Sequence, residues 1–163
     1  MSATDRLLEA NRAHAAGFGG GGLDARPATG VAVVTCMDAR VDVYALLGLE
    51  PGDAHVIRNA GGVVTDEVIR SLTISQHKLG TTEVAVIGHT GCGLEGLDQD
   101  EFADELERET RAPRDWSIAA FADVGESVRE SIARLRESPF LSRSEGIRGF
   151  VYDIETGALR EVS

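Results

Sequence analysis

Both cysteines of the chain stand close to other side chains that could take part in chemistry. Cys36 is followed at alternate positions by Asp38 and Arg40, and His89 precedes Cys92 by three residues. Thiolates and a histidine nitrogen are ligands of Zn²⁺, and a Cys₂His set with an open fourth position is typical of catalytic zinc sites. The residue types and their spacing therefore predict a zinc site on Cys36, His89 and Cys92.

Asp38 and Arg40 would complete such a site, because alternate residues of an extended segment point the same way. A carboxylate beside the metal can accept a hydrogen bond from bound water, or it can occupy the fourth position as a ligand itself. Arg40 can hold Asp38 through two parallel hydrogen bonds and keep it ionised. The predicted chemistry is attack of a metal-bound hydroxide on a small electrophile, with Asp38 and Arg40 as the catalytic residues.

Other interpretations of the same residues stay open at this point. The two cysteines could be small buried hydrophobes. They could also be a redox pair, although the chain has no Cys-x-x-Cys motif. Asp38 and Arg40 could form a purely structural ion pair at the end of a strand.

The elements that must position these residues follow from alternating strand and helix patterns. Short apolar, β-branched runs are typical of strands buried on both faces, and they occupy residues 31–35, 54–58, 83–88 and 149–154. Residues 159–162 add a short antiparallel edge strand. Strands separated by helices imply an α/β fold around a mainly parallel sheet of about four strands plus that edge strand. In such sheets the active site lies outside the carboxyl ends of the strands, where Cys36 and His89 stand.

Helices are predicted between the strands, each beginning at a polar N-cap. The candidate caps are Thr4, Asp42, Thr65, Asp98 and Asp123. Four glycines at residues 19–22 follow the first helix, so we interpret residues 1–22 as an N-terminal arm with a Gly-rich linker. The arm belongs to a single domain of residues 1–163, and it would pack either on another subunit or on its own core. Arg58 and Asn59 stand at the end of the second strand, where they could border the pocket, and we expect them to hold the adjoining loop together.

The composition excludes several classes of function. The 163 residues include 16 Lys+Arg and 27 Asp+Glu, and the formal net charge of −11 disfavours nucleic acid as a partner. No apolar run approaches the roughly 20 residues that cross a bilayer. The first residues mix acids with arginines, unlike a signal or transit peptide. We therefore expect a cytoplasmic protein with a small-molecule substrate and no nucleic-acid or membrane partner.

Three motifs in this order closely resemble those of the β-class carbonic anhydrases. They are Cys36-x-Asp38-x-Arg40, the segment from Pro51-Gly52-Asp53 to Arg58-Asn59-Ala60-Gly61-Gly62, and Gly88-His89-Thr90-x-Cys92-Gly93. The resemblance implies a zinc lyase that interconverts CO₂ and bicarbonate, with one Zn²⁺ per subunit on Cys36, His89 and Cys92. It also implies that Asp38 switches between ligating zinc and pairing with Arg40.

The same resemblance implies an assembly and leaves two other functions open. The family is built on homodimers, with each site at the subunit interface and an N-terminal helix embracing the partner; a tetramer is the alternative. Closely similar scaffolds hydrolyse carbon disulfide or carbonyl sulfide, so a zinc hydrolase of that kind is one alternative function. A non-catalytic zinc-binding domain on the same scaffold is the other.

Overall fold

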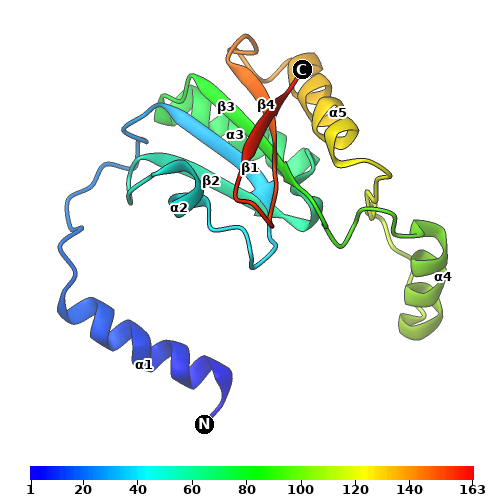
Figure 1. The fold of residues 1–163 in the computed structure, drawn as a ribbon, viewed down its shortest axis with the longest axis horizontal. Coiled ribbons are helices and arrows are strands. Elements are labelled where there is room, and N and C mark those ends of the chain that lie inside the picture. Colours follow the sequence, from blue (N-terminus) through cyan, green and yellow to red (C-terminus); the bar gives the residue numbers. More distant parts are fainter.

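A computed structural model describes residues 1–163 as a five-stranded sheet with helices packed against it (Figure 1). The strands are β1 (Val31–Cys36), β2 (Ala54–Asn59), β3 (Glu83–His89), β4 (Ile147–Tyr152) and β5 (Leu159–Val162). Their order in the sheet is β2-β1-β3-β4-β5. All neighbouring strands are parallel except β4 and β5, which are antiparallel. The predicted α/β fold, a mainly parallel sheet with an antiparallel edge strand, is confirmed.

The fourth strand begins and ends earlier in the chain than predicted. It begins at Ile147, which already pairs with β3, and it ends at Tyr152. The backbone N–H of Asp153 donates instead to the carbonyl of Ala158 at 2.9 Å. That bond closes the turn into β5, so the chain leaves the parallel ladder before the end of the apolar run.

The helices begin at polar caps, as their sequences indicate. They are α1 (Ala3–Ala16), α2 (Val43–Leu47), α3 (Asp66–Leu79), α4 (Gln99–Thr110) and α5 (Val124–Glu137), with a short 3₁₀ turn, η1 (Ala60–Gly62). A backbone N–H of the first turn donates to each of the predicted caps Asp42, Thr65, Asp98 and Asp123. The prediction of Thr4 as the first cap is wrong. Ser2 caps α1, because its hydroxyl accepts from the Asp5 N–H while the Asp5 carboxylate accepts from the Ser2 N–H.

Helices cover the two faces of the sheet unequally. On one face, α3 and α5 pack over a core cluster of 15 buried residues, which includes Leu72 and Leu135. On the other face the core cluster has 4 buried residues, and α2 contributes Val43 to it. Strand side chains on this second face, such as Phe150 and Tyr152, are only half-buried. A parallel sheet is normally covered on both faces. Here the second face is covered only in part, as its small core and half-buried side chains show.

Two helices, α1 and α4, stand away from the sheet (Figure 1). No residue of α1 is buried, and α4 buries only Ala103. An irregular, Gly-rich stretch, residues 17–30, joins α1 to β1. Of the two placements predicted for the arm, packing on its own core is therefore not the one observed. No helix of the chain combines the length and the apolar character needed to cross a membrane.

Candidate functional site

The strand order brings the two cysteine-containing motifs together. The order reverses at the neighbouring strands β1 and β3, since β2 lies beyond β1 and β4 lies beyond β3. Such a reversal leaves a crevice outside the carboxyl ends of the strands. Cys36 ends β1 and His89 ends β3. The hydroxyl of Thr35 donates to the carbonyl of Ile87 at 2.8 Å and ties the two strand ends to each other.

Three buried donor side chains converge at this crevice: Cys36, His89 and Cys92. Their donor atoms all lie within 4.8 Å of one another, and the two sulfur atoms are 4.0 Å apart. Two sulfurs bound to one tetrahedral Zn²⁺ at ~2.3 Å would lie about 3.8 Å apart. Both thiols are free, and the three residues are 4%, 1% and 6% exposed in the order named. The donor set, its burial and its spacing fit a zinc ion.

The imidazole of His89 is held in the tautomer that metal binding requires. Its Nδ1 lies 2.9 Å from the carbonyl oxygen of Thr90. Because a carbonyl can only accept, Nδ1 carries the proton and Nε2 has a free lone pair. That Nε2 is buried without a hydrogen-bond partner, which is rare in folded proteins. A metal ion is the partner that the surrounding thiols suggest.

A tight turn after β3 carries the third donor back toward the strand ends. Gly91 has a φ of +62°, a left-handed conformation that favours glycine. The N–H of Thr90 donates to the carbonyl of Tyr152 at 3.0 Å, and its hydroxyl accepts from the N–H of Ile154 at 3.2 Å. These bonds anchor the turn to β4 and to the residues after it, so the position of Cys92 is fixed by the sheet.

Asp38 and Arg40 form the paired group that the sequence predicts. The Arg40 side chain donates from Nε to Asp38 Oδ1 at 2.9 Å and from Nη2 to Oδ2 at 2.6 Å, and the Arg40 backbone N–H donates to Oδ1 at 2.9 Å. These bonds hold the pKa of the Asp38 carboxyl well below its usual range. Asp38 Oδ2 lies 3.7 Å from His89 Nε2, so the carboxylate borders the donor cluster.

The same guanidinium links the two halves of the site. Arg40 Nη2 also donates to the carbonyl of Gly91 at 2.9 Å. One arginine therefore binds the carboxylate that follows β1 and the backbone that follows β3.

Burial controls the protonation of the Cys92 thiol. Removal from water raises its pKa, and the sulfur of Cys36 raises it further, while a hydrogen bond from the backbone of Leu94 acts in the opposite direction. A bound metal ion deprotonates a coordinating thiol outright. A cation bound beside Cys92 would therefore offset the effect of burial on this thiol.

All five residues that the sequence selected lie together, and the remaining histidines lie elsewhere. The His55 ring lies 2.7 Å from the hydroxyl of Ser75, and the His77 ring lies 3.0 Å from the carbonyl of Phe140. Sequence reasoning missed two backbone acceptors: the carbonyl of Thr90, which lies beside His89 Nδ1, and the carbonyl of Gly91, to which Arg40 donates. Main-chain acceptors leave no residue-type signal, so no pattern in the sequence could have identified them.

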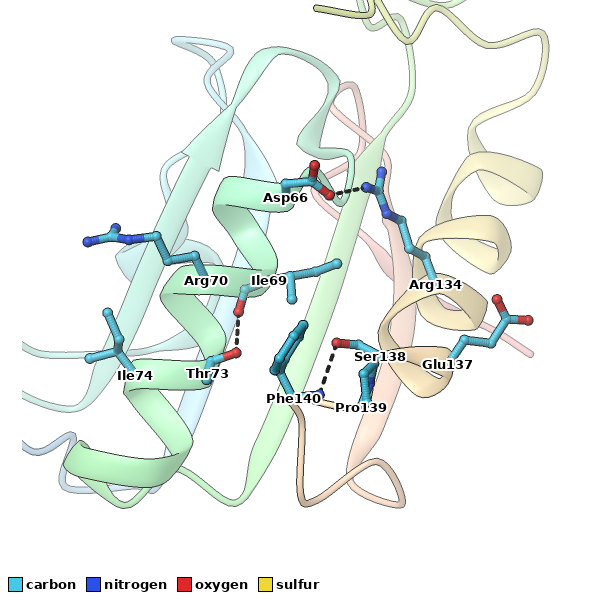
Figure 2. Close-up of a pocket in the computed structure, with 10 residues that line it drawn as sticks. All are labelled: Asp66, Ile69, Arg70, Thr73, Ile74, Arg134, Glu137, Ser138, Pro139 and Phe140. Atoms are coloured by element: carbon cyan, nitrogen blue, oxygen red, sulfur yellow. Dashed lines mark hydrogen bonds and ion pairs between the residues drawn. The ribbon is translucent and has the colours of Figure 1, made fainter.

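A pocket of ≈ 570 Å³ lies between α3 and α5 and is separate from this site (Figure 2). Ile69, Ile74 and Phe140 line it, and the ion pair of Asp66 with Arg134, 2.6 Å between N and O, links the two helices beside it. None of the donor residues lines this pocket. The pocket therefore lies outside the candidate metal site.

Comparison with known proteins gives a consistent set of relatives. The family described as carbonic anhydrase matches residues 31–159. Beta-carbonic anhydrase 1 of Mycobacterium tuberculosis is 47% identical over 163 residues, which cover 100% of this chain and 99% of that protein. A carbon disulfide hydrolase of Saccharolobus solfataricus is 35% identical over 79% of this chain and 75% of its own. The crystal structure of a carbonic anhydrase from Streptococcus mutans superposes with a TM-score of 0.93 at 46% identity, covering 100% of this chain and 99% of that one.

Proposed function

Because the chain belongs to the β-carbonic anhydrase family and is an enzyme of that class, we propose that it hydrates CO₂ reversibly to bicarbonate and a proton at a bound Zn²⁺. The ligands would be Cys36, His89 and Cys92, one ion per subunit. The observation that carries the proposal is the buried Cys₂His donor set in which His89 Nε2 has no other partner. Three protein ligands leave one position open, as hydration chemistry requires.

The residues around the donors have distinct roles in this proposal. Zn²⁺ would supply a Lewis acid that makes water a nucleophile near neutral pH. Asp38, kept ionised by Arg40, can only accept hydrogen bonds. A water or hydroxide that donates its proton to Asp38 Oδ2 would therefore turn an oxygen lone pair toward the substrate. Arg40 restrains both carboxylate oxygens, which limits the number of orientations that Asp38 can adopt.

Asp38 also has a second possible position. We propose that it can rotate away from Arg40 and act as a ligand itself, since its Oδ2 borders the donor cluster, 3.7 Å from His89 Nε2. In that position Asp38 would exclude water as a fourth ligand. The pair with Arg40 opposes this rotation, so the state of the Asp38–Arg40 pair decides whether the open position is available.

Hydrolysis of carbon disulfide is the alternative on the same scaffold, since a relative of that name is 35% identical to this chain. The higher identity and full coverage of the carbonic anhydrase relative favour CO₂. The same donor set without turnover would be expected of a non-catalytic zinc domain. In such a domain the Asp38–Arg40 pair would have no catalytic role.

We further propose that the enzyme is a cytoplasmic homodimer, with a tetramer as the alternative. The incompletely covered face of the sheet and the unburied helix α1 support an assembly in which the arm contacts a second subunit. The two free buried thiols suit a reducing compartment.

Metal analysis and stopped-flow CO₂ hydration on one sample test the proposal. We expect about one Zn²⁺ per chain and CO₂ hydration that exceeds carbon disulfide turnover. His89→Ala should lose both metal and activity, because it removes a ligand. His77→Ala is the matched control, since His77 also contacts a backbone carbonyl but lies outside the site. Full metal content in His89→Ala would contradict the ligand assignment, and zinc without any turnover would favour the non-catalytic alternative.

A further inference from the structure

A second arginine binds the backbone of the same segment whose carboxylate Arg40 binds. Arg58 lies near the end of β2, opposite Thr35 of β1 in the parallel register. Its Nε donates to the carbonyl of Cys36 at 2.9 Å, and its Nη2 donates to the carbonyl of Asp38 at 2.7 Å. The guanidinium forms no ion pair with any carboxylate of the chain. Both of its observed hydrogen bonds therefore go to this backbone segment.

The two hydrogen bonds of Arg58 lie where the chain leaves the sheet at the end of β1. After β1, the N–H of Met37 still donates to the carbonyl of Asn59 at 2.8 Å. The chain then enters a turn in which the N–H of Val41 donates to the carbonyl of Asp38 at 3.0 Å. Arg58 binds one carbonyl before Met37 and one after it, so it spans the junction between strand and turn.

Two arginines thus bind different groups of Asp38. Arg40 binds its carboxylate, and Arg58 binds its backbone carbonyl. We propose that Arg58 is a positioning residue, which fixes the backbone from Cys36 to Asp38 so that the thiol and the carboxylate keep their places opposite His89. The inference rests on the proposed zinc site, and it gives Arg58 no contact with the substrate.

Arg136 provides a matched control for this proposal. It is also an exposed arginine, and its Nη2 donates to a backbone carbonyl, that of Ile147, at 3.1 Å. Ile147 begins β4, at the opposite end of the parallel sheet from Cys36. Arg136→Ala therefore removes a bond of the same kind without touching the site.

The rate of zinc release separates a positioning role from a merely structural one. Zinc-loaded native protein, Arg58→Ala, Arg58→Lys and Arg136→Ala are each mixed with excess chelator, and zinc transfer is followed. Groups that orient metal ligands are typically worth 10–100-fold in metal affinity. We expect Arg58→Ala to release zinc about tenfold faster than native protein, and Arg136→Ala to stay within about twofold. Arg58→Lys should lie between them, because an ammonium lacks the planar fork that reaches two carbonyls.

Hydrogen exchange and kinetics give two further measurements on the same variants. The amide of Val41, which donates to the Asp38 carbonyl, should exchange faster in Arg58→Ala than in Arg136→Ala. CO₂ hydration should fall mainly through kcat, with KM little changed, because the substrate is not contacted.

The outcomes distinguish this inference from the function on which it rests. Zinc release and Val41 exchange in Arg58→Ala that match Arg136→Ala would overturn the positioning role. If Arg58→Ala does not fold, Arg58→Lys is compared with Arg136→Ala instead, and a native rate of release again overturns it. Native protein that binds no zinc would contradict the proposed function before any variant is compared.

Discussion

Gly62 provides a direct test of how the fold supports Cys36. Gly62 lies in η1 with a φ of +65°, and a Cβ added there would lie 2.7 Å from the backbone nitrogen of Cys36 and 2.9 Å from the carbonyl carbon of Thr35. Ordinary contacts of a Cβ begin near 3.4 Å. Gly62→Ala must therefore push the end of β1 and the turn apart, because backbone atoms cannot move aside as a side chain can.

The expected cost has two parts. The left-handed conformation costs a non-glycine residue ~1–2 kcal/mol, and overpacking against fixed atoms costs ~1–3 kcal/mol more. The free energy of unfolding should fall by about 2–5 kcal/mol in total. For a chain of this size, each kcal/mol lowers Tm by about 2–4 °C, which gives a fall of roughly 4–20 °C.

Gly80→Ala separates the two parts. Gly80 ends α3 with a φ of +79°, but a Cβ there would meet nothing within 4 Å. It should therefore show only the conformational cost of ~1–2 kcal/mol. Thermal unfolding is followed by circular dichroism at fixed protein and zinc concentration. The free energy of unfolding of Gly62→Ala should be lower than that of Gly80→Ala by about 1–3 kcal/mol. Gly62→Ala should also bind zinc more weakly. Equal effects of the two substitutions on Tm and on zinc affinity would refute the close-packing argument.

Three other perturbations test separate parts of the structure. Arg40→Gln should raise the Asp38 pKa toward its usual range and lower kcat about tenfold or more, measured by stopped-flow CO₂ hydration; unchanged kcat would remove Arg40 from the catalytic group. The Glu161 pKa is lowered by its hydrogen bonds from Arg148. That pair therefore stabilises the fold above the usual glutamate pKa of about 4.3 and loses its effect as pH falls through the lowered value. The Tm difference between native protein and Glu161→Gln should shrink as pH is lowered from about 5 to 3, and a difference that grows would contradict this sign. Deletion of residues 1–22 should weaken the proposed dimer, measured by light scattering after gel filtration, and an unchanged dimer would exclude the arm from the interface.

The strands and the donor residues could be predicted because both depend on local patterns. The β-branched run of residues 31–35 predicts a buried strand from its local pattern alone. A cysteine directly after that run must lie at the carboxyl end of the strand. His89 and Cys92 are three residues apart, so one turn brings them together. That Cys36 would join them was predicted from the chemistry of the donor set, and the strand order brings it about by placing β1 beside β3.

A supporting role for Arg58 and Asn59 was predicted, but the partners of the supporting contacts could not be, because they depend on register and on main-chain atoms. Arg58 reaches the carbonyl of Asp38 only because β2 pairs with β1 so that Arg58 lies opposite Thr35. Gly62 touches Cys36 only through the path of η1. The error at the first helix has a similar cause: Ser2 and Thr4 both have hydroxyls that could cap α1, and the reciprocal bond with Asp5 selects Ser2.

Removal of the proposed zinc ion should leave this fold intact, because the contacts that assemble the donor cluster need no metal. The hydroxyl of Thr35 ties β1 to β3, and Arg40 ties the turn after β1 to the turn after β3. The larger core cluster, under α3 and α5, includes none of the donor residues. Small zinc domains behave differently, since their folding free energy comes from the metal itself.

We therefore expect the chain stripped of zinc by a chelator at neutral pH to keep its far-ultraviolet circular dichroism spectrum. Its Tm should rise with added Zn²⁺, because a ligand that binds only the folded state stabilises that state according to its concentration. Collapse of the dichroism signal on chelation would mean that the metal builds the site. In that case the hydrogen bonds of Thr35, Arg40 and Arg58 would be insufficient to hold the two turns together.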